Sequence, residues 1–184
     1  MTHMTFCTAS IHILILHSSH CASPVVQQVF EKSISDAMPN ARWAIDHFHV
    51  VMKANEAVDV VRREIQKGMA RVDRIKTKKG LAYTLKTRLK DLDPEDAAKI
   101  KAARSNPELA PLATAFDLQE DFFNIYDENP SSKDNAKKAF KQWEQSIPKN
   151  AIYDKFRELA ATVHRFEDQI FAYWDCPIAT VSYT

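Results

Sequence analysis

The chain has 184 residues, of which 45% are hydrophobic, so a disordered composition is excluded and there is material for one domain or two small ones. Only two glycines occur, which excludes Gly-rich phosphate loops and hairpin-rich all-β folds. The net charge is +1, and the three cysteines form no CxxC pair. Dispersed cysteines fit a reducing compartment, and no run is apolar for long enough to span a membrane. We therefore expect a cytoplasmic protein with no membrane partner.

The first 49 residues predict a small α/β segment. Residues 11–16 are apolar and predict a short strand, residues 25–38 predict a helix, and residues 41–46 predict a buried strand that ends at Asp46. Residues 1–24 contain no Asp, Glu, Lys or Arg and look unlike the rest of the chain. Two strands do not make a stable sheet, so this start looks like part of a larger domain.

From residue 50 onward the pattern is helical. Apolar residues follow helical spacing over residues 51–72, and residues 78–80 break that pattern. A short element of uncertain type follows near Leu85. We therefore predict a mainly α chain, with a multi-helix domain over residues 50–184 behind a divergent and partly α/β segment over residues 1–49.

Capping signals divide the later part of this domain. Asp93 precedes Pro94 and predicts a helix start, and Asn106 before Pro107 repeats the signal. Ser131 or Ser132 is expected to cap the next helix. The last predicted helix lies between Pro148 and Pro177 and is continuous.

Positive charge is concentrated over residues 62–90, which hold eleven Lys and Arg against two acids; this net +9 leaves −8 for the rest of the chain. Four of these cations follow helical spacing on the face opposite the apolar residues: Arg63, Lys67, Arg71 and Arg74. A one-sided basic stripe suits contacts with DNA phosphates, although a solvated helix face has the same pattern. Tyr83 is the only aromatic residue of this stretch, which gives base stacking little support.

The most specific segment begins at residue 44 and reads Ala-Ile-Asp-His-Phe-His-Val-Val, followed by Asn-Glu-Ala-Val-Asp over residues 55–59 and by Arg62-Arg63. It resembles the region of the second catalytic aspartate in ISL-three-type insertion-sequence transposases, and the likeness covers about residues 30–184. The resemblance implies an RNase H-like DDE domain interrupted by a helical insertion. It also implies three acids that hold Mg²⁺ or Mn²⁺ for DNA strand cleavage and transfer. Asp46 takes the place of one such catalytic and metal-binding acid.

The other two acids of the family pattern are not found. The first falls on Val25 or Cys21, and the third, a Glu, is expected just beyond Thr184. One carboxylate does not fix two metal ions. We therefore expect a transposase fragment that holds no metal stably and is inactive in strand transfer alone, and the sequence leaves its status as an enzyme open.

Alternatives remain for the site and for the function. Asp46 could be only the N-cap of the following helix, and His47 and His49 would share one face of a strand, as zinc ligands do. The chain could also be a non-catalytic helical module that binds DNA or pairs with a second copy or an intact transposase. A third possibility is that the chain is a relic of a decayed insertion element and has no function.

Overall fold

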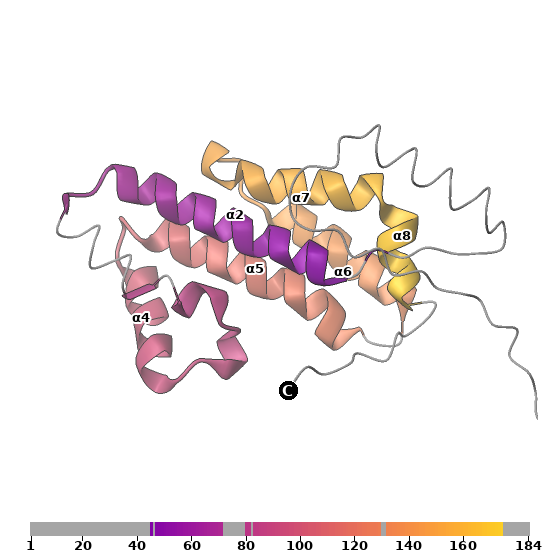
Figure 1. The fold of residues 1–184 in the computed structure, drawn as a ribbon, viewed down its shortest axis with the longest axis horizontal. Coiled ribbons are helices and arrows are strands. Elements are labelled where there is room, and N and C mark those ends of the chain that lie inside the picture. Colours follow the sequence, from indigo (N-terminus) through magenta and orange to yellow (C-terminus); the bar gives the residue numbers. More distant parts are fainter. Residues whose placement is uncertain (1–44, 46, 72–79, 82, 130–131, 175–184) are drawn as a thin grey trace, which may run out of the picture. The chain divides into compact units, whose positions relative to one another are not determined.

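The structure is a computed structural model that describes residues 45, 47–71, 80–81, 83–129 and 132–174 (Figure 1). Within these ranges every regular element is helical, which confirms the prediction of a mainly α chain. The two predicted strands and the helix over residues 25–38 lie outside the described residues, apart from Ile45. None of the described helices is both long and apolar enough to cross a membrane.

The chain divides into two compact units, one over residues 47–167 and the other formed by the flanking residues 1–46 and 168–184. The first is called the helical unit below. Its elements follow in chain order: α2 (His47–Lys67), η1 (Thr84–Lys86), η2 (Leu89–Asp91), α4 (Pro94–Ser105), α5 (Ala110–Glu128), α6 (Lys133–Ser146), η3 (Ala151–Tyr153) and α7 (Asp154–Arg165). Helix α8 (Glu167–Phe171) begins at the boundary and is followed by η4 (Ala172–Trp174).

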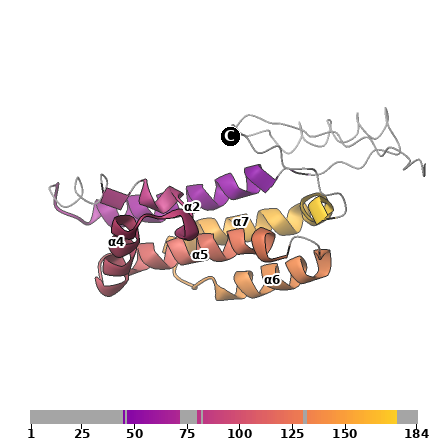
Figure 2. The same ribbon diagram turned by 90° about the horizontal axis from the view of Figure 1, so that it is seen from below.

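Helix α5 is the centre of the helical unit. It packs against α2, α4 and α6, and α2 packs in turn on α7 (Figures 1 and 2). Phe116 and Phe122 of α5 and Phe156 of α7 are almost fully buried. Removing a side chain of this size from water stabilises the fold by about 1.5–3 kcal/mol. Apolar burial along α5 therefore holds the other helices in place.

Two polar contacts fix the neighbours of α5 more specifically. The Trp143 indole N–H on α6 donates to the Leu118 carbonyl at 2.7 Å, and the Trp143 ring lies 4.8 Å from that of Phe122. On the α2 side, the amide of Gln119, which is only 1% exposed, donates to the side-chain oxygen of Asn55. Because a buried polar group needs a partner, these bonds set the register of α6 and α2 along α5.

The capping predictions at two helix starts are confirmed. The Asp93 carboxylate accepts from the Asp96 backbone N–H at 2.8 Å, and Pro94 occupies the first turn of α4. The Ser132 hydroxyl accepts from the Asn135 N–H at 3.3 Å and caps α6. Each cap satisfies a backbone donor that the helix itself leaves unpaired.

Three predicted helix boundaries are wrong. Helix α2 ends at Lys67, because the N–H of Gly68 bonds to the Ile65 carbonyl three residues back and closes the last turn. Helix α5 begins at Ala110, because Asn106 forms a turn of its own ahead of the helix. The final helix is interrupted at Phe166, which leaves helical geometry between α7 and α8.

In the flanking unit, the two chain segments that border the helical unit are joined. The backbone N–H of Ile45 donates to the carbonyl of Gln169 at 3.0 Å. Phe171 is buried and its ring stacks on Trp174 at 5.4 Å. The chain thus leaves this unit after Ile45 and returns beside the same residue.

Candidate nucleic-acid interface

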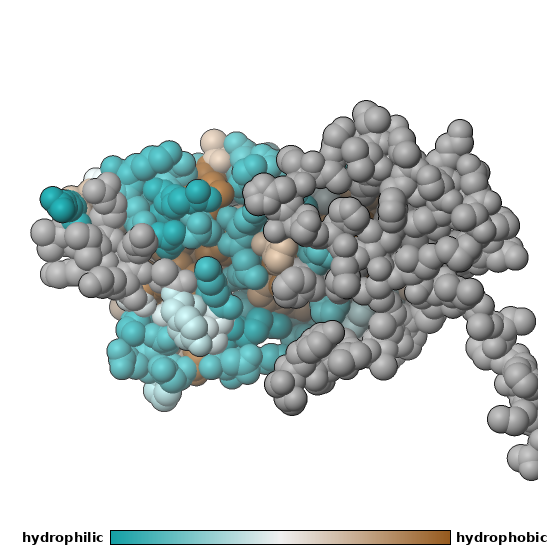
Figure 3. All heavy atoms as spheres, viewed as in Figure 1, coloured by the Kyte–Doolittle hydropathy of each residue, from teal (hydrophilic) through white to brown (hydrophobic). Residues whose placement is uncertain are grey.

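Helix α2 has one buried face and one basic, solvated face. Ala54, Ala57, Val58 and Val61 are almost fully buried. On the opposite face, Arg63 and Lys67 have side chains that are 59% and 71% exposed. The space-filling view shows a mainly hydrophilic surface over the C-terminal half of α2 (Figure 3).

The predicted stripe is not carried by a single helix. Arg63 and Lys67 lie on α2, whereas Arg71 is exposed but follows the break at Gly68. Arg74 lies outside the described residues. The name α2 stripe is used below for Arg63, Lys67 and Arg71.

The ion pairs of the α2 stripe are short-range and solvated. Arg63 Nε lies 3.2 Å from a carboxylate oxygen of Asp59, and Lys67 Nζ lies 2.6 Å from one of Glu64. Each acid lies three or four residues earlier on the same helix. Exposed pairs of this kind contribute well under about 1 kcal/mol, so a phosphate can replace either carboxylate at little cost. Arg71 forms no ion pair with a described residue.

Arg62 is next to the stripe in sequence but points inward. Its side chain is 11% exposed, and its guanidinium bonds Asp59 at 2.9 Å and Gln66 at 2.7 Å. Asp59 therefore serves both Arg62 and Arg63. The Arg62 cation has its partners inside the helical unit and is not available to a ligand.

Arg88 is the second inward cation of the basic stretch, and its contacts are called the Arg88 clamp below. Its guanidinium bonds three side chains of α5: Glu120 at 3.1 Å, Asn124 at 3.0 Å and Asp127 at 3.0 Å. It also lies 4.9 Å from the centre of the Phe123 ring. This role could not be predicted from the sequence, because the partners lie 32 to 39 residues further along the chain.

Cations of α4 are also paired within the unit. Arg104 lies 2.5 Å from Asp117 of α5, and the hydrogen bond to Asp117 raises the pKa of this guanidinium. Lys99 lies 2.7 Å from Asp96, and that hydrogen bond raises the lysine pKa and lowers that of Asp96. Two of the three cations of α4 are thus paired with acids, whereas the third, Lys101, is exposed and forms no ion pair with a described residue.

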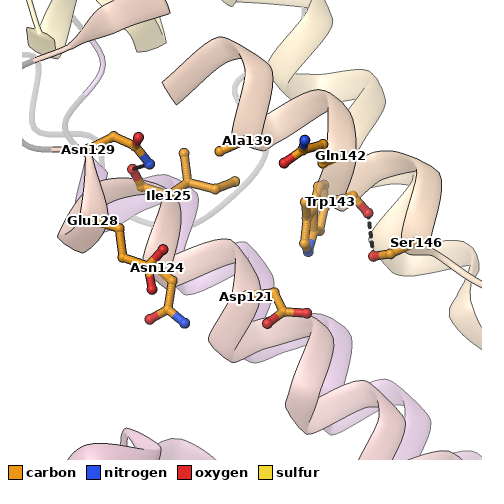
Figure 4. Close-up of a pocket in the computed structure, with 9 residues that line it drawn as sticks. All are labelled: Asp121, Asn124, Ile125, Glu128, Asn129, Ala139, Gln142, Trp143 and Ser146. Atoms are coloured by element: carbon orange, nitrogen blue, oxygen red, sulfur yellow. Dashed lines mark hydrogen bonds between the residues drawn. The ribbon is translucent and has the colours of Figure 1, made fainter. Parts of the chain in front are cut away.

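A hollow of about 290 Å³ lies between α5 and α6 (Figure 4). Asp121, Asn124 and Glu128 line it from α5, and Gln142 and Trp143 line it from α6. Burial raises the pKa of the Asp121 carboxyl, and nearby carboxylates such as Glu128 add to the effect. The two carboxylates of this wall, Asp121 and Glu128, disfavour the approach of a phosphate.

The described residues do not build a metal centre. Asp46 lies outside them, and no group of three His, Cys, Asp or Glu side chains within the described ranges is placed to hold an ion. The zinc alternative for His47 and His49 required that both lie on a strand, whereas they lie on the first turn of α2. Residues two apart on a helix point in nearly opposite directions. A metal site therefore needs acids from elsewhere in the protein.

Comparison with known protein families matches residues 26–183 to a family described as transposase, the DDE group of ISL3 type. Neither the comparison with curated proteins nor that with solved structures gives a match. The family match confirms the resemblance drawn from residues 44–63. Enzymes of this family act on DNA and use divalent metal ions. Since the match spans most of the chain, the protein belongs to the ISL3-type DDE transposase family.

Proposed function

We propose that this chain serves DNA transposition by means of its helical unit, which contacts DNA phosphates through the α2 stripe. The observation that carries the proposal is the exposure of Arg63 and Lys67, whose carboxylate partners among the described residues lie on the same helix. Phosphate contacts of this kind position a protein on DNA without reading sequence. Each one releases counterions, which makes binding sensitive to salt.

The helical unit is in this proposal an insertion in an RNase H-like domain. The hydrogen bond between Ile45 and Gln169 supports it, because the segments before and after the unit meet in the flanking unit. A domain inserted in another must have neighbouring ends.

We infer that this chain does not catalyse strand transfer alone. Asp46 stands at the family's second acid, whereas Val25 and Cys21 occupy the candidate positions of the first. Two divalent ions a few ångströms apart need several carboxylates. We infer that Asp46 is a metal ligand only when other acids complete the site.

Fluorescence anisotropy with a labelled DNA duplex tests the phosphate contact. The stripe variant carries Arg63→Ala, Lys67→Ala and Arg71→Ala. The matched control carries Lys138→Ala, Lys141→Ala and Lys149→Ala, which removes the same charge from exposed positions on and just after α6. We expect the stripe variant to lose at least about tenfold in affinity and the control to lose much less. Equal losses would show that only net charge matters, and would contradict the proposal.

Calorimetry with Mn²⁺ tests the inference about Asp46. The chain alone should bind no ion tightly, and Asp46→Asn should give the same trace. Tight binding by the wild type that disappears in Asp46→Asn would show that Asp46 has a complete set of ligands within this chain, and would overturn the inference.

A further inference from the structure

We propose that Tyr83 provides a stacking surface for an unpaired DNA base, an inference that rests on the proposed DNA contact of the helical unit. In the described part of the chain only two large hydrophobic side chains are exposed, Tyr83 at 76% and Leu89 at 44%. Tyr83 lies in the stretch of net charge +9. An exposed aromatic ring among cations is the arrangement with which proteins hold single-stranded nucleic acid.

The backbone that carries this ring is held firmly. The Tyr83 carbonyl accepts from the Lys86 N–H at 2.9 Å and from the Thr87 hydroxyl at 3.3 Å. The next two residues, Thr84 and Leu85, are 1% and 4% exposed. The ring is thus displayed from an anchored turn, and stacking needs little further ordering of the backbone.

The Arg88 clamp anchors the same segment from its other side. It fixes the residue between η1 and η2 to Glu120 and Asn124 of α5. Since α5 is the centre of the helical unit, the position of Tyr83 is set by the core. A base that stacks on the ring therefore meets a preorganised surface.

A cation stands on the same side of the turn as the ring. Tyr83 and Lys86 are three residues apart at the 3₁₀ turn η1, where side chains at positions i and i+3 eclipse. Lys86 is exposed and forms no ion pair with a described residue. The phosphate of a nucleotide can thus contact Lys86 while its base lies on Tyr83. This pairing of ring and cation favours a nucleotide over an apolar protein surface.

The test compares two labelled DNAs, a blunt duplex and the same duplex with a single-stranded overhang. We expect Tyr83→Ala to lower the affinity for the overhang DNA about tenfold and to leave that for the blunt duplex unchanged. Tyr83→Phe keeps the ring and should bind as the wild type. Leu89→Ala removes the other exposed apolar side chain and should have no effect. Because both side chains are exposed, none of these variants should impair folding.

Four results would overturn the inference. Wild-type affinity of Tyr83→Ala for the overhang DNA, together with a loss in the stripe variant, would remove stacking and leave the proposed function intact. A loss in Tyr83→Phe equal to that in Tyr83→Ala would assign the effect to the hydroxyl. Absence of binding to either DNA by the wild type would remove both proposals. Loss of a dimer in Tyr83→Ala, seen by sedimentation without any change in DNA affinity, would make Tyr83 a protein contact.

Discussion

The α2 stripe and the Arg88 clamp come from one basic stretch but occupy opposite environments. The side chains of Arg63 and Lys67 are more than half exposed, and their acids lie three or four residues away. The Arg88 side chain is 21% exposed, and its acids come from a different helix. One of them, Glu120, is only 8% exposed as a residue.

The contrast shows that charge density in a sequence overstates the charge available to a ligand. Arg62 and Arg88 count toward the net charge of +9 of the stretch, yet both guanidinium groups are hydrogen-bonded to side chains inside the helical unit. Burial of the cation's own side chain is what distinguishes the two groups: Arg62 and Arg88 are 11% and 21% exposed, against 59% and 71% for Arg63 and Lys67. A cation buried beside its acid is structural, whereas an exposed cation can exchange its carboxylate for phosphate.

Removal of the clamp should produce the largest loss of stability. Arg88→Met leaves the nearly buried carboxylate of Glu120 without its cation, and we expect the free energy of unfolding to fall by about 2–3 kcal/mol. Urea denaturation followed by circular dichroism measures this loss. The double variant Arg88→Met with Glu120→Gln should regain part of it, because the unpaired charge is gone. A double variant as unstable as the sum of both single variants would contradict a direct pairing.

Loss of the α4 cap should have a smaller effect. Asp93 lies just after η2, so its cap holds the end of the segment that the clamp fixes at Arg88. Asp93→Ala should lower the free energy of unfolding by about 1 kcal/mol, since one backbone donor loses its acceptor. The same urea series measures it, with Asp91→Ala as the control at an exposed site without a capping bond. A larger loss for Asp93→Ala than for Arg88→Met would place the main anchor at the cap.

Neutralising the α2 stripe should barely change stability. The pairs of Arg63 and Lys67 are exposed and lie within one helix, so the stripe variant should stay within about 0.5 kcal/mol of the wild type in urea. Its DNA affinity should fall nonetheless. A stability loss above about 2 kcal/mol would show that the stripe, like the clamp, is structural.

Lowering the pH should weaken the Arg88 clamp, because it protonates the Asp127 carboxylate. Desolvation alone would raise the pKa of this carboxyl, but hydrogen bonds and charge from Lys90 and Arg88 outweigh it and hold the pKa below the ordinary 3.8. A lowered pKa in the folded state stabilises the fold above the unfolded pKa, and this contribution is lost as the pH falls through the folded value. The urea midpoint should therefore fall less steeply with acidification in Asp127→Asn than in the wild type. Identical slopes would contradict this role.

Local signals in the sequence predicted the helices well. The caps at Asp93 and Ser132 depend on a side chain and a backbone donor three residues later, so the pattern that specifies them is contiguous. The buried face of α2 followed from its periodicity. The end of α2 at Gly68 was missed because an apolar pattern continues past the break and glycine only weakens a helix.

Contacts across the fold were beyond sequence reasoning. Nothing in the order of residues shows that Arg88 meets Glu120 or that Arg62 turns inward. Tyr83 gave little sign of a role, because an aromatic residue in a sequence is more often buried than displayed. Its exposure depends on the turn at η1 and on the clamp, which only the packing of α5 supplies.

The salt dependence of DNA binding tests the central claim most directly. The logarithm of the affinity constant is measured against the logarithm of salt concentration for the wild type, the stripe variant and the Lys138, Lys141 and Lys149 control. Each lost phosphate contact reduces the magnitude of the slope of this plot by about 0.9. The slope of the stripe variant should therefore be smaller in magnitude than that of the wild type by about 2–3, and the slope of the control should equal that of the wild type. A stripe variant with the wild-type slope would show that these cations do not contact phosphate.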